Sequence, residues 1–157
     1  MNKNFLSLLS ALACAVALAL SAGCGGGGGA GGGGGGGGGG TRVQGLVTET
    51  IGLSGVEGIT VDFYNSGGSR VGSATTNAFG VYDAAVSQVP TTVHIRNSSL
   101  SAAFYRTYRF NNKWYLPAES TCRAPITGIV GGVANSLATI QVAPAAGPPP
   151  PPPTGCN

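Results

Sequence analysis

From residue 42 onward, apolar and polar positions alternate along several short stretches. The clearest stretch is residues 59–64, where Ile59, Val61 and Phe63 alternate with Thr60 and Asp62. Side chains of a strand point alternately to opposite faces, so this period of two predicts a half-buried strand. Related patterns predict strands at residues 43–48, 70–76, 81–86, 92–96 and 137–142. The core between two sheets is then expected to include Val56, Ile59, Val61, Phe63, Val93 and Ile95.

Turn residues separate these stretches. The sequences Asn65-Ser66-Gly67-Gly68 and Asn111-Asn112 are typical of tight turns. In the turn at residues 77–80, we expect Gly80 to have a positive φ, where a β-carbon is penalised. We expect Tyr82 to bury its ring and to find a hydroxyl partner near the end of the sheet. Phe79 is expected to be either a surface contact or a lid on the core.

The composition agrees with one all-β domain. Residues 41–143 lie between a glycine run and a proline-rich end, and their number is typical of a single domain with one core. Their apolar side chains are mostly β-branched or aromatic, which favours strands. Charged residues make up 8% of the chain and the net charge is +3. No basic stripe is present, so we expect no nucleic-acid partner.

The first half of this domain contains four motifs in order: Val43-Gln44-Gly45-Leu46-Val47, Gly55-Val56, Ile59-Thr60-Val61 and Thr76-Asn77-Ala78-Phe79-Gly80-Val81-Tyr82. Together they resemble the V-x-G-x-V, G-V, V-x-V and T-x-x-x-G-x-Y pattern of the carboxypeptidase regulatory-like (transthyretin-like) domains. The resemblance covers residues 43–96, and Phe79 departs from the small or polar residue usual in that turn. It implies a single seven-stranded Greek-key β-sandwich of the prealbumin type over residues 41–143.

The N-terminus has the organisation of an export signal. Lys3 precedes an uncharged apolar run at residues 5–19, which is shorter than the roughly 20 residues a membrane-spanning helix needs. The run ends in Leu20-Ser21-Ala22-Gly23-Cys24, which resembles the lipobox of bacterial lipoproteins. The resemblance implies that residues 1–23 are a signal peptide and that Cys24 carries a diacylglyceryl group and an N-acyl chain such as palmitate.

That reading places the protein in the cell envelope, anchored to the membrane by lipid. By the same resemblance, Gly25 in place of an acidic residue favours the outer membrane in a cell that has two. An alternative cleavage site, Ala17-Leu18-Ala19, would instead release a soluble secreted protein. Both possibilities put the domain outside the cytoplasm.

Low-complexity segments flank the domain. Residues 25–40 are glycine except for Ala30 and cannot bury side chains, so with Cys24 they are expected to form a disordered linker at residues 24–40. Residues 144–157 form a proline-rich tail with six consecutive prolines, which favour a semi-rigid polyproline II segment. This tail can serve as a spacer or as a docking ligand for another protein.

Two cysteines remain in the mature domain, Cys122 and Cys156. In an oxidising compartment they are expected to form one disulfide that folds the tail back onto the domain. The alternative is two free or intermolecular thiols. Two distant cysteines and a single histidine lack the spacing of a metal site, so no metal or other cofactor is expected.

Few side chains suggest catalysis. His94, the only histidine, is expected on an exposed face of its strand. Asp62 and Asp83 could pair as catalytic carboxylates, but each has the solvent-facing phase of its strand. Enzymes of the transthyretin-like fold use several histidines and a C-terminal tyrosine-arginine motif, and the carboxypeptidase relatives keep their catalytic residues on another domain. We therefore expect no enzyme activity.

Six aromatic residues are concentrated between residues 103 and 116. Phe104, Tyr108 and Phe110 share one strand phase and are expected to fill the core. The candidates for exposed ligand contacts are Tyr105, Trp114 and Tyr115, because aromatic faces stack on sugars and provide rigid contact area.

These observations predict a lipid-anchored, non-catalytic envelope β-sandwich that binds carbohydrate or peptide or has a structural role. One alternative is an adhesion or assembly subunit that binds a protein through the proline-rich tail or a free Cys156. A second is a small hydrolase that uses His94. The oligomeric state does not follow from the sequence.

Overall fold

A computed structural model describes residues 40–156. The expected signal peptide, Cys24 and nearly all of the expected linker lie outside the described residues. Within 40–156 no helix has the length and apolar character to cross a membrane. This described part of the chain forms ten strands and one short 3₁₀ helix at Asn97–Ser99: β1 Arg42–Glu49, β2 Thr60–Tyr64, β3 Arg70–Thr75, β4 Val81–Ala85, β5 Thr92–Ile95, β6 Phe104–Phe110, β7 Lys113–Tyr115, β8 Ala124–Pro125, β9 Ala134–Ser136 and β10 Ile140–Pro144.

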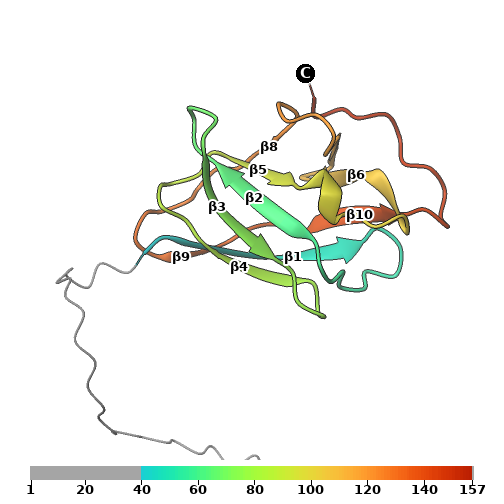
Figure 1. The fold of residues 1–157 in the computed structure, drawn as a ribbon, viewed down its shortest axis with the longest axis horizontal. Helices are drawn as coiled ribbons and strands as arrows, with labels where there is room; N and C mark the ends of the chain where they lie inside the picture. The colour runs from blue at the N-terminus through green and yellow to red at the C-terminus, as the bar shows by residue number, and fades with distance from the viewer. Residues whose placement is uncertain (1–39, 157) are drawn as a thin grey trace, which may run out of the picture. The chain divides into compact units, whose positions relative to one another are not determined.

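The strands form two sheets (Figure 1). The larger sheet has the order β4-β1-β10-β6-β7, with β9 paired to β1, and the smaller has the order β3-β2-β5-β8. β1 pairs with β10 and β9 in parallel, and the other pairings are antiparallel. The predicted all-β sandwich is confirmed. Seven strands have four residues or more, and the short β7, β8 and β9 extend the sheets at their margins.

The core lies between the sheets and follows the alternation of the sequence. In β2, Val61 and Phe63 are fully buried, and in β5 so are Val93 and Ile95. The larger sheet contributes inward-facing residues from β1, β4, β6 and β10, among them Val43, Val47, Tyr82, Tyr108, Ile140 and Val142. All six core residues expected from the sequence are buried: Val56, Ile59, Val61, Phe63, Val93 and Ile95.

Two glycines allow close approaches that the fold requires. A β-carbon on Gly45 would lie 2.3 Å from the Tyr82 hydroxyl oxygen, because this buried ring crosses the neighbouring strand at that point. Gly80 has a φ of 76°, as expected. A β-carbon there would meet the backbone carbonyl of Val47 at 2.3 Å.

The expected hydroxyl partner of Tyr82 is absent within residues 40–156, where this buried oxygen makes no hydrogen bond. Phe79 is 78% exposed, so it does not cover the core.

The proline-rich tail is tied to the domain. Cys122 and Cys156 form the expected disulfide, with their Cα atoms 4.7 Å apart. Just before Cys156, the backbone amides of Thr154 and Gly155 donate to the carbonyl of Trp114 in β7. These bonds cover part of an edge strand that would otherwise present free backbone groups. The tail, red in Figure 1, therefore acts as a strap that runs from β10 back to β7.

Candidate functional site

Two polar residues expected in solvent are buried. Asp62 of β2 and His94 of β5 are directly opposite each other, on the face of the smaller sheet that points away from the core. They are only 3% and 5% exposed, so the expectation of solvated side chains was wrong. The physical reason is that the segment at residues 116–123 folds over this face: its Pro117 carbonyl lies 3.2 Å from His94 Nε2. Alternation indicated correctly which residues share a face, but it could not show that a distant segment covers that face.

A two-point ion pair holds the Asp62 carboxylate. Arg96 donates from Nε to Oδ2 at 3.0 Å and from Nη2 to Oδ1 at 2.7 Å. Such paired, charge-assisted bonds are among the strongest in proteins. They raise the pKa of Arg96, mainly through the hydrogen bond to Asp62. A second guanidinium, that of Arg70 in β3, lies 3.7 Å from Asp62 Oδ1 and makes no hydrogen bond to it.

His94 is enclosed by protein groups. In addition to the Pro117 contact, its Nδ1 lies 3.5 Å from the Tyr108 hydroxyl, which bonds to the carbonyl of Val93. Tyr64 and Tyr108 both meet the imidazole edge-on. Burial lowers the pKa of His94 from its usual value of 6.5, with the Pro117 and Cys122 carbonyls opposing the shift. The ring is therefore neutral at neutral pH, and both nitrogens face protein groups.

An open groove of about 430 Å³ lies over these residues. It is lined by residues of β2, β3 and β5, of the 3₁₀ segment with the arginine before it, and of the segment at residues 116–123. The charged and aromatic members are Asp62, Tyr64, Arg70, His94 and Arg96. One face of the Tyr64 ring carries the Arg123 guanidinium, 3.6 Å from the ring centre. The remaining lining residues are small or polar: Asn97, Ser98, Pro117, Ala118 and Ser120. Side chains from three strands and two connections thus converge on one concave, polar surface.

The second carboxylate of the proposed pair is elsewhere. Asp83 lies on β4 of the larger sheet, where it accepts bonds from Arg42 at 2.6 and 3.0 Å and from Gln44 at 3.1 Å. The hydrogen bond from Arg42 lowers the pKa of Asp83. The two aspartates are on different sheets, so the structure does not bring them together.

The aromatic candidates do not form a common surface on the groove. Tyr115 is 1% exposed and stacks on Tyr108 in the core, so its expected exposure was wrong. The reason is the strap: a β-carbon on Gly155 would lie 2.2 Å from a Tyr115 ring carbon, which shows how closely the tail packs on this ring. Tyr105 and Trp114 are half-buried. The Tyr105 hydroxyl donates to the Gly147 carbonyl at 3.3 Å, and neither side chain lines the groove.

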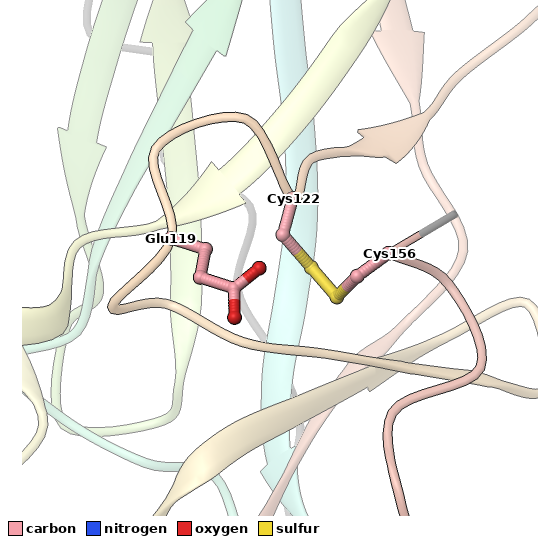
Figure 2. A group of neighbouring side chains, drawn as sticks. All are labelled: Glu119, Cys122 and Cys156. Atoms are coloured by element: carbon pink, nitrogen blue, oxygen red, sulfur yellow. A yellow bond between two sulfur atoms is a disulfide. The ribbon is translucent and has the colours of Figure 1, made fainter.

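Figure 2 shows the Glu119 carboxylate beside the Cys122–Cys156 bond. Possible ligand atoms of these three residues lie within 4.8 Å of one another. Both sulfur atoms are used in the disulfide, so this group lacks the thiolates that a zinc ion would require.

Arg70 and Arg96 were not expected as site residues. Arg70 begins β3 and Arg96 follows directly after β5, and both have the outward phase of the alternation. A usable signal was the outward phase shared by Asp62 on one strand and Arg96 on a strand that could pair with it. The segment at residues 116–123 had no such signal, because no periodicity places a loop on a sheet.

Comparisons with protein-family models, with curated proteins and with solved structures returned no match for this chain.

Proposed function

We propose that this protein is a lipid-anchored, non-catalytic binding module of the bacterial cell envelope. The observation that carries the proposal is the groove over Asp62, His94 and Arg96, a concave polar surface built on a rigid sheet. Ligand sites are concave, and they contain a few fixed polar groups that orient the ligand. The Asp62–Arg96 pair and the Pro117 contact of His94 fix such groups in advance.

The envelope location rests on the sequence and on the disulfide. Cys24 at the end of the apolar leader supplies the anchor, and two or more acyl chains hold a protein stably on a membrane. The Cys122–Cys156 disulfide fits an oxidising compartment outside the cytoplasm.

The arrangement of titratable groups favours binding over hydrolysis. A general base needs a lone pair that can reach the substrate, and a nucleophile must lie within hydrogen-bond distance of that base. The nitrogens of His94 face Pro117 and Tyr108, and both oxygens of Asp62 are held by Arg96. Cys156 is used in the disulfide, so it does not provide the free thiol that one form of the assembly alternative requires.

Two bulky substitutions test whether the groove binds. Ser98→Trp places an indole at the side of the groove, and Ser54→Trp adds the same side chain at an exposed loop outside the groove lining. On an array of envelope glycans and peptides, we expect a bound class of ligand whose binding is lost in the first variant and kept in the second. An array without any bound ligand, or binding that survives Ser98→Trp, contradicts the proposed site.

The anchor is tested separately. With labelled palmitate, we expect incorporation into the membrane-bound protein and its loss in Cys24→Ser. Incorporation that persists in this variant contradicts the assignment of Cys24 as the lipidated residue.

A further inference from the structure

The groove contains a guanidinium whose donors make no hydrogen bond within residues 40–156. The side chain of Arg70 is 55% exposed, and its ion pair with Asp62 at 3.7 Å is longer than a hydrogen bond. Asp62 already accepts two short bonds from Arg96. The donors of Arg70 therefore remain free to bind a group that enters from solvent.

The charged side chains in and beside the groove favour an anion. Its lining contains one carboxylate, that of Asp62, and two guanidiniums, those of Arg70 and Arg96. His94 is neutral at neutral pH because burial lowers its pKa. Glu119 is in the segment at residues 116–123 but lines the hollow next to the disulfide. The lining thus has one positive charge in excess, and Arg123 on the Tyr64 ring adds a further cation beside it. The planar fork of a guanidinium matches the geometry of a carboxylate.

The remaining lining suits a polyhydroxylated ligand. Ser98 and Ser120 are exposed, and their hydroxyls have no hydrogen-bond partner within residues 40–156. Tyr64 is half-buried and lines the same groove. Aromatic rings pack against the apolar faces of ligands while hydroxyls bond to polar groups, and a sugar presents both kinds of surface.

An extended peptide fits this surface less well. Peptides that add to a sheet bond to the free backbone of an edge strand. The groove lies across β2 and β5, and β2 is paired on both sides, with β3 and with β5. β5 is likewise paired with β8 over part of its length. We infer that the groove binds a saccharide that bears a carboxylate, such as a uronic acid residue, with Arg70 binding that carboxylate. This inference rests on the proposed binding function.

The chain contains two natural reporters for the test. His94 is its only histidine and lines the groove, whereas Trp114 is its only tryptophan and does not line the groove. Their ring signals in an NMR spectrum therefore need no assignment by mutation. The full chain is titrated with trigalacturonate, with its methyl ester and with the neutral galactose trisaccharide.

Arg70→Gln and Arg42→Gln form a matched pair of variants. Both arginines lie on the surface, with side chains 55% and 50% exposed, and each pairs with one aspartate, but Arg42 is on the other sheet. We expect trigalacturonate to shift the His94 signal and to leave the Trp114 signal in place. We expect affinity to fall about tenfold or more in the methyl ester and in Arg70→Gln, and to stay unchanged in Arg42→Gln.

Three results would overturn the inference. If the neutral trisaccharide shifts His94 with equal affinity, the groove binds sugars but does not select the carboxylate, and the proposed binding function survives. If trigalacturonate shifts Trp114 alone, the ligand binds at the aromatic strands, and the assignment to the groove is wrong. If none of the three saccharides shifts either signal, the saccharide class is wrong, and the peptide arm of the array then decides whether the binding function stands.

Discussion

Opening the Cys122–Cys156 disulfide tests whether the strap stabilises this fold. The bond joins residues separated by 34 positions. In the chain-entropy model, a loop of that length removes enough freedom from the unfolded chain to add about 4 kcal/mol of stability at 25 °C. Without the bond, only hydrogen bonds and packing hold the tail. The hydrogen bonds include those that the backbone amides of Thr154, Gly155 and Ala145 donate, and the one from the Tyr105 hydroxyl to the Gly147 carbonyl. None of them constrains the unfolded chain as the disulfide does.

Loss of the bond also has a local consequence. Gly155 packs against the ring of Tyr115, and burial raises the pKa of that phenol. Without the cross-link, we expect the tail to fray from β7, which uncovers Tyr115 and the edge of Trp114. Trp114 fluorescence then reports release of the strap, because it is the only tryptophan.

The assay is urea-induced unfolding of the oxidised and reduced protein, with Trp114 fluorescence and circular dichroism as two probes. We expect reduction to lower the free energy of unfolding by about 3–4 kcal/mol. We also expect the Trp114 emission of the reduced protein to move toward that of exposed indole before the sheets unfold. The double variant C122A/C156A is the control, since reductant must leave it unchanged. Reduction that changes stability by less than about 0.5 kcal/mol, the scale of an ordinary surface substitution, would refute the reasoning.

Three further predictions follow from the packing and the charges. Gly45→Ala puts a β-carbon against the buried Tyr82 ring, so we expect urea unfolding to show a loss of about 1–2 kcal/mol and not the gain usual for alanine in a strand. Gly80→Ala forces a non-glycine residue to a φ of 76° and toward the Val47 carbonyl, so we expect a loss above about 2 kcal/mol in the same assay. Burial lowers the pKa of His94 below 6.5, so as the pH falls the unfolded protein binds a proton at this imidazole before the folded protein does. The melting temperature should therefore fall from pH 7 to pH 5, and it should depend less on pH in His94→Gln.

The alternation of apolar and polar residues predicted the strands, because a half-buried strand has apolar residues at every second position, on the face that packs in the core. Val61 and Phe63 point inward while Asp62 points away from the core, as the alternation required. Two of the turns were also predicted from their residue types: Gly80, Asn111 and Asn112 have the positive φ values that occur in tight turns.

The environment of the outer face could not be predicted in the same way. The burial of Asp62 and His94 depends on Pro117, more than twenty residues beyond His94 in the chain. Tyr115 is buried because the tail returns to cover it, and that return depends on a disulfide between residues far apart in sequence. Both cases involve irregular segments, whose paths are set by tertiary contacts and not by a repeating pattern.

The lipid anchor and the disulfide are tested together by the intact mass of the protein extracted from membranes of the cell that produces it. The account predicts a chain that begins at Cys24, carries a diacylglyceryl group and an N-acyl chain, and lacks the two thiol hydrogens of Cys122 and Cys156. A soluble, unmodified chain that begins at residue 20, or a chain that retains its leader, would contradict it.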